Sequence, residues 1–89
     1  MILTRLEKRI LRELAGKPQA SAVLGSRLID ASEPPAKRRY RMLMKLGRMR
    51  TRGLVRSVGT VNGDSVWSLT DVGRRQAALC CRHGKGVTA

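Results

Sequence analysis

Positive charge is concentrated in one stretch of the chain, residues 35–56. Nine Lys and Arg residues lie between Glu33 and Asp64, and no acidic residue separates them: Lys37, Arg38, Arg39, Arg41, Lys45, Arg48, Arg50, Arg52 and Arg56. Helices ordinarily relieve such repulsion with acidic side chains three or four positions away. The uniform sign therefore indicates an external anion, and a nucleic-acid phosphate backbone is the simplest one.

The composition agrees with a polyanion as partner. The chain has 89 residues, a formal net charge of +13 and a pI near 11.6, which predict strong, salt-sensitive association with nucleic acid. Its hydrophobic fraction is 42%, with no Phe, one Trp and one Tyr, so we expect a single small domain with an aliphatic core. Stacking of aromatic side chains on unpaired bases is hardly available.

Other classes of function find little support in the residues. The sole histidine, His83, lies near the C-terminus, the six acidic residues are scattered, and no glycine-rich phosphate loop follows a strand, so we expect neither an enzyme nor a cofactor. The adjacent Cys80 and Cys81 fall short of a zinc site, and we interpret them as reduced thiols. With no apolar run of membrane-spanning length and a charged N-terminal region, we expect a cytoplasmic, nucleoid-associated protein without membrane contact.

Two helices are predicted before the basic stretch. Thr4 and Glu7 have the spacing of a capping box, so the first helix is expected to run from there to about Ala15. Its apolar face consists of Leu3, Leu6, Ile10 and Leu14, with Arg5, Arg9 and Arg12 on the solvated faces.

The second helix is shorter, with Ser21 as its cap and an end near Asp30. We expect its inward residues to be Val23, Leu24, Leu28 and Ile29. Gly25 costs about 1 kcal/mol of helix propensity, which is tolerable if the next helix crosses closely there.

The third helix is expected over Pro35–Thr51, since Pro34 precedes a proline and avoids helical backbone angles whereas Pro35 suits the first helical position. At 100° per residue, its buried side comprises Met42, Leu46 and Met49, flanked by Leu43. The opposite side carries Lys37, Arg41, Met44 and Arg48, bordered by Tyr40, Lys45, Thr51 and Arg52. Arg39 and Arg50 turn partly toward the core, where their stems can pack.

A β-hairpin is predicted from Leu54 to Leu69, with a two-residue turn at Asn62 and Gly63. Counting back from that turn, Val61 faces Asp64, Val58 faces Trp67 and Arg56 faces Leu69. Val58, Trp67 and Leu69 would then share the covered face. The other face, which includes Val55, is expected to be exposed.

A last helix is predicted over Asp71–Arg82, capped by Thr70. Its inward side would consist of Val72, Gln76, Leu79 and Cys80. Residues 83–89 contain two glycines and show no apolar period, so they are expected to form a mobile tail after a domain of residues 1–82.

This order of elements is typical of an α+β winged helix-turn-helix module, in which the third helix enters the DNA major groove. Two strings carry a resemblance to a family, RMLMKLGRMRTRGLVRSV and VWSLTDVGRR. They resemble the recognition helix, the Gly-Leu-Val exit and the second hairpin strand of bacterial MarR, PadR and ArsR regulators. We expect no small-molecule effector, because the flanking helices of MarR and PadR proteins and the metal ligands of ArsR sensors do not occur in the sequence.

The resemblance places seven residues at groove-facing or groove-flanking positions: Lys37, Arg38, Tyr40, Arg41, Met44, Lys45 and Arg48. The expected DNA-binding set is Lys37, Arg38, Tyr40, Arg41, Lys45, Arg48, Arg52 and Arg56. Arg41 is the first choice for a base contact, because guanidinium to guanine is the commonest specific pairing. Lys37, Arg38, Lys45 and Arg48 are expected to hold phosphates.

The sequence therefore favours sequence-preferring binding of double-stranded DNA and a role in transcription, as a repressor rather than an activator. Two alternatives stay open. One is a general binder of RNA or nucleoid DNA, and the other is a protein-interaction module that grips an acidic partner. A homodimer through the last helix is also an expectation.

Overall fold

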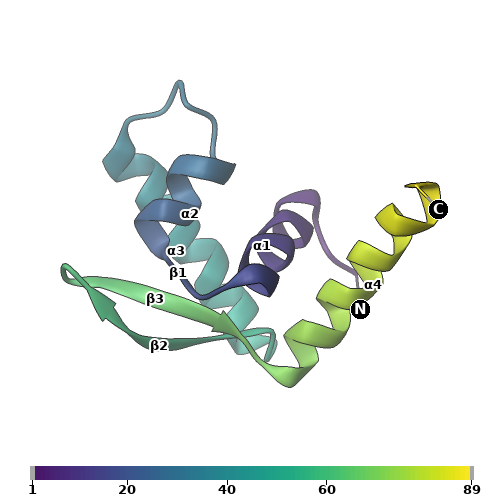
Figure 1. The fold of residues 1–89 in the computed structure, drawn as a ribbon. Coiled ribbons are helices and arrows are strands. Elements are labelled where there is room, and N and C mark those ends of the chain that lie inside the picture. Colours follow the sequence, from purple (N-terminus) through teal and green to yellow (C-terminus); the bar gives the residue numbers. More distant parts are fainter. Residues whose placement is uncertain (1, 89) are drawn as a thin grey trace.

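The computed structural model describes the backbone of residues 2–88 and the side chains of residues 2–80. The elements in chain order are α1 (Arg5–Gly16), β1 (Gln19–Ala20), α2 (Ser21–Leu28), α3 (Pro35–Thr51), β2 (Val55–Val61), β3 (Asp64–Leu69) and α4 (Asp71–Thr88). Figure 1 shows α2 and α3 packed together on one side of α1, α4 on its other side, and the β2–β3 hairpin extending below α2 and α3. The strands form one antiparallel sheet in the order β1-β3-β2.

The capping box at the start of α1 is confirmed. The Thr4 amide donates to Glu7 Oε1 at 2.7 Å, and the Glu7 amide donates to Thr4 Oγ1 at 3.2 Å. These two bonds satisfy amide donors that have no partner inside the helix. Ile10, Leu11 and Leu14 are buried, so α1 forms one wall of the core.

Ser21 does not cap α2, contrary to the prediction. Ala20, the second residue of β1, occupies the cap position, and β1 pairs with β3. The Ser21 hydroxyl instead donates to the Ser65 carbonyl at 3.3 Å and accepts from Trp67 Nε1 at 2.8 Å. The Ser21 hydroxyl is therefore bonded to a residue 46 positions away in the sequence, whereas the local capping pattern predicted that it would bond an amide at the helix start. The predicted burial of Leu24 and Leu28 is confirmed, whereas Val23 is 43% exposed.

The predicted bounds of α3 agree with the structure. Pro35 occupies the first turn, and Met42, Leu46 and Met49 are fully buried. The close crossing expected at Gly25 is also present, because a Cβ atom on Gly25 would lie 3.0 Å from the Arg38 carbonyl oxygen. The α2–α3 pair is therefore held at a spacing that a larger residue would disturb.

The hairpin has the predicted turn but a different register. Asn62 and Gly63 adopt positive φ angles of 52° and 78°, and Val61 pairs with Asp64 as expected. A bulge between Ser57 and Gly59 then shifts the pairing, so Trp67 faces Ser57 and Leu69 faces Val55.

The expected covered face is therefore wrong for β2. Val58 is 47% exposed, and Val55, which the sequence placed outside, is 1% exposed. One extra residue in a strand moves the side chains beyond it to the other face, and here, counting back from the turn, these are the residues on the N-terminal side of the bulge. Gly59, at φ 158°, takes the backbone conformation next to this bulge.

Thr70 caps α4 as predicted, since its Oγ1 accepts the Gly73 amide at 3.0 Å. The predicted inward side of the helix is wrong at Val72 and Leu79, which are 40% and 55% exposed. Gln76 and Cys80 are half-buried, and the buried residues of the helix are Gly73 and Ala77. A Cβ atom on Gly73 would lie 2.0 Å from the Leu54 carbonyl oxygen, so only the small-residue face of α4 fits here.

The end of α4 also differs from the prediction. The helix continues to Thr88, beyond the expected end at Arg82, because glycines such as Gly84 weaken a helix without stopping it. The mobility of residues 83–89 stays a prediction, and the side chains of Cys81, Arg82 and His83 lie outside those that the structure describes.

The core is aliphatic, as expected, with Trp67 and Leu69 from β3 beneath the helices. Its fully buried members are Ile10, Leu11, Leu24, Met42, Leu46, Met49 and Leu54. Across residues 2–88, none of the helices combines the length and the apolarity that crossing a bilayer requires.

Candidate nucleic-acid interface

The outer face of α3 is fixed by the burial of its inner face. Met42, Leu46 and Met49 hold one side of the helix in the core, so the side chains opposite them project to solvent. The exposed side chains on that outer face are Lys37, Tyr40, Arg41, Met44 and Arg48. The structure thus brings five residues named from the helical pattern onto one surface.

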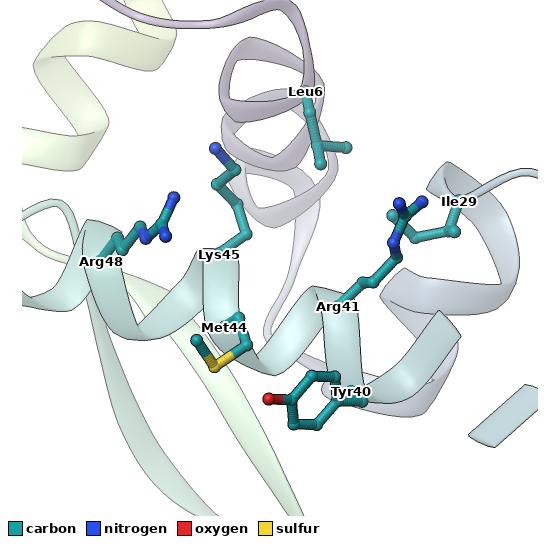
Figure 2. Close-up of a pocket in the computed structure, with 7 residues that line it drawn as sticks. All are labelled: Leu6, Ile29, Tyr40, Arg41, Met44, Lys45 and Arg48. Carbon is teal, nitrogen blue, oxygen red and sulfur yellow. The ribbon is translucent and has the colours of Figure 1, made fainter. Parts of the chain in front are cut away.

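A shallow hollow of about 430 Å³ lies beside this surface, between α3, α1 and the end of α2 (Figure 2). Its lining consists of Leu6, Ile29, Tyr40, Arg41, Met44, Lys45 and Arg48. Leu6 and Ile29 supply an apolar edge from the neighbouring helices, and the cations come from α3 alone. A groove of this composition suits a ligand that is negatively charged along its length.

Arg41 is not free on this surface. Its Nη1 lies 2.6 Å from Glu33 Oε2, and the two side chains are 57% and 18% exposed. An exposed pair of this kind contributes at most about 1 kcal/mol, so a stronger anionic partner can displace the carboxylate.

Arg38 lies at the flank of α3 and is half-buried. Its Nε atom is buried and has no hydrogen-bond partner among the described residues. Lys45, on the same flank, is also half-buried and lies near Glu7 of α1.

Arg52 joins the end of α3 to the start of α1. Its Nη1 donates to Glu7 Oε2 at 2.6 Å, and its Nη2 donates to the Ile2 carbonyl at 2.8 Å. Burial raises the pKa of the Glu7 carboxyl, but the hydrogen bonds from Thr4 and the charges of Arg52 and Lys45 outweigh it and hold that pKa below its ordinary value. Arg52 is therefore committed to a contact within the fold.

Arg39 connects α3 to the hairpin. Its Nε donates to Asp64 Oδ1 at 3.0 Å, and Asp64 Oδ2 accepts the Ala22 amide at 2.7 Å. The sequence indicated only that Arg39 turns toward the core, and it gave Asp64 no role. One feature of the sequence could have indicated that Asp64 pairs with an arginine of α3. Asp64 is the first acidic residue after Glu33, and it directly follows the Asn62–Gly63 turn.

Arg56 is exposed on β2, opposite Ser68 rather than Leu69 because of the bulge. Among the described residues of the hairpin, Arg56 is the arginine, and it is separate in sequence from the cations of α3. Among the side chains of residues 2–80, no group of three His, Cys, Asp or Glu residues is arranged to hold a metal ion.

Comparison with known proteins decides the fold. No protein-family model and no curated protein sequence matches the chain. Among solved structures, Lactococcus lactis ZitR in complex with DNA is similar over 97% of this chain and 56% of that chain, with a TM-score of 0.74 and 22% identity. The adhesin competence repressor AdcR from Streptococcus pyogenes is similar over 97% of this chain and 59% of that chain, with a TM-score of 0.78 and 15% identity.

The chain has a winged-helix fold. At these identities the likeness shows the fold alone, and the chain spans little more than half the length of these similar structures. The α+β winged helix-turn-helix expected from the sequence is thereby confirmed. In this fold α2 and α3 form the helix-turn-helix, α3 occupies the position of the recognition helix, and the β2–β3 hairpin is the wing.

Proposed function

We propose that this winged-helix protein binds double-stranded DNA with a preference for sequence and regulates transcription, as a repressor rather than an activator. The observation that carries the proposal is the cationic outer face of α3, presented by a helix whose opposite face is fully buried. The similar ZitR was solved in complex with DNA, and the similar AdcR is named a repressor. We propose a cytoplasmic, nucleoid-associated location and no enzymatic activity, cofactor or small-molecule effector.

The proposed roles divide the cations by their surroundings. Lys37, Lys45 and Arg48 have flexible stems and hold phosphates, which fixes register without reading sequence. Arg38, which is half-buried at the flank, does the same. Arg41 exchanges Glu33 for a guanine edge when the helix enters the major groove.

The remaining two cations of the expected set, Arg52 and Arg56, act differently. Arg52 is held by Glu7 and by the Ile2 carbonyl, so its proposed role is to fix the angle between α1 and α3. Arg56, exposed on the wing, contacts a phosphate of the neighbouring backbone.

A general nucleic-acid binder is the second candidate, and the net charge of +13 favours it. Such a protein would bind random duplex, RNA and selected duplex with similar affinity. The low aromatic content of 2% argues against recognition of single strands by stacking. An interaction module for an acidic protein would bind none of these nucleic acids with preference.

Selection from a pool of random duplexes at one moderate salt concentration tests the proposal. We expect a defined sequence to be enriched and to bind at least about tenfold more tightly than random duplex, since specific and non-specific affinities differ widely. A palindromic result would indicate the homodimer that we also propose, because half-site symmetry follows protein symmetry. Equal affinity for selected duplex, random duplex and RNA would overturn sequence preference.

A further inference from the structure

An uncharged strip runs along the outer face of α3 between its cations. Tyr40, Met44 and Gly47 recur at the spacing of one helix side, and Tyr40 and Met44 are 63% and 48% exposed. Figure 2 shows the Tyr40 ring and the Met44 side chain next to each other on one side of α3, while Lys45 and Arg48 project to the other side. The side chains of Tyr40 and Met44 therefore point away from those of Lys45 and Arg48.

No close contact among the described residues requires a glycine at position 47. A Cβ atom there would meet no atom within 4 Å, whereas Cβ atoms on Gly25 and Gly73 would meet neighbouring backbone. A glycine in the middle of a helix destabilises it relative to alanine. The absent side chain leaves an open notch beside Met44, at the half-buried flank of α3.

The composition of the strip determines what it can contact. Phosphates would bind the cations, and the strip offers them no charge. Large apolar side chains on an otherwise cationic surface gain free energy only against an apolar partner. In the major groove that partner is the C5 methyl group of thymine.

We propose that Tyr40, Met44 and Gly47 form the base-reading strip of α3, and that they recognise thymine through its methyl group. The inference rests on the proposed function and deepens it. Met44 supplies a flexible, polarizable contact for the methyl group. Tyr40 adds a ring edge and a hydroxyl that can bond a base edge, and the notch at Gly47 lets a base approach the helix backbone.

Replacement of thymine by deoxyuridine tests the methyl contact, since this change removes the methyl group and keeps the hydrogen-bonding edge. The probe is the duplex selected from the random pool, with each thymine replaced in turn. We expect at least one position to bind about fourfold more weakly, the factor that burial of one methyl group corresponds to. Met44→Ala or Tyr40→Ala should weaken binding to the thymine duplex and abolish the difference between thymine and deoxyuridine.

Gly47→Ala provides an independent test, because stability and binding should change in opposite directions. The added methyl group enters open space in a helix, so the unfolding midpoint should rise, while the filled notch should weaken binding to the selected duplex several-fold. Gly16→Ala, also in open space but on α1, is the matched control and should leave binding unchanged. Val23→Ala, an exposed apolar residue on α2, controls for the loss of surface area.

These results separate the inference from the proposed function. If no duplex is enriched, the proposed function fails. If a duplex is enriched but deoxyuridine is tolerated at every position, or Gly47→Ala binds as tightly as the wild type, the strip does not read thymine.

Discussion

Arg39 Nε donates to Asp64 Oδ1 at 3.0 Å, and this bond ties α3 to the tip of the wing. The same carboxylate accepts the Ala22 amide at the start of α2, so one buried side chain joins both helices of the helix-turn-helix to the hairpin. Ser21 adds a second link through Trp67. The position of the wing relative to α3 is thus set by hydrogen bonds within the fold.

Asp64→Asn should loosen this junction. The amide keeps one acceptor but loses the charge-assisted bond to Arg39, and we expect the free energy of unfolding to fall by about 1–3 kcal/mol in urea titrations. Amide hydrogen exchange should accelerate in residues 60–66. Asp71→Asn, an exposed acid in the first turn of α4, is the control and should cost less than about 1 kcal/mol. Equal effects of the two variants would show that Asp64 does not hold the wing.

Glu7 should make stability depend on pH. The pKa of Glu7 is lowered in the folded protein, so its contribution is fully present above the ordinary value of 4.5 and is lost as the pH falls through the lowered folded pKa. Glu7→Gln should therefore be less stable than the wild type at pH 6, and the difference should shrink below pH 4.5. Arg52→Gln should remove part of the same dependence. A difference that stays constant across this range would contradict the Glu7–Arg52 pairing.

Arg41 and Glu33 should be coupled in DNA binding. Arg41→Ala should cost about 1–3 kcal/mol on the selected duplex and flatten the preference over random duplex. Glu33→Gln should strengthen binding, because it frees the guanidinium that lies 2.6 Å from the carboxylate. In the double variant the gain from Glu33→Gln should largely disappear. Additive effects would mean that Glu33 does not act through Arg41, and an unchanged affinity of Arg41→Ala would mean that Arg41 does not reach the DNA.

Gly73→Ala tests how α4 docks. A Cβ atom at this position would lie 2.0 Å from a backbone oxygen of Leu54, so the helix must shift and the free energy of unfolding should fall by about 3 kcal/mol. Gly16→Ala has open space and should cause no loss. Thermal unfolding of both variants gives the comparison, and an unchanged midpoint for Gly73→Ala would refute the close approach.

The elements that depend on local signals were predictable. The capping box at Thr4 and Glu7, the proline pair before α3 and the Asn62–Gly63 turn each determine backbone geometry within a few residues, and each is confirmed. The burial of Met42, Leu46 and Met49 follows from periodicity in the same way.

The predictions that failed concern features that depend on contacts between residues far apart in the sequence. Ser21 bonds Ser65 and Trp67 instead of capping α2, and the bulge at Gly59 moves Val55 into the core. The inward face of α4 is set by the Leu54 backbone against Gly73, which no periodicity in residues 71–82 reveals. For the site, the helical pattern predicted the exposed cations, whereas the partners of Arg41, Arg52 and Arg39 required the folded chain.

The salt dependence of duplex binding tests the central role of α3 most directly. The variant Lys37→Gln/Arg48→Gln removes two charges from the proposed interface, and Arg5→Gln/Arg9→Gln removes two exposed charges from the solvated side of α1. Fluorescence anisotropy over a range of salt concentrations should show that the α3 variant reduces the slope of log affinity against log salt by about 2, since each lost phosphate contact changes it by about 0.9. The α1 variant should change the slope by much less. If the two variants reduce the slope equally, or if neither does, the outer face of α3 is not the surface that binds DNA.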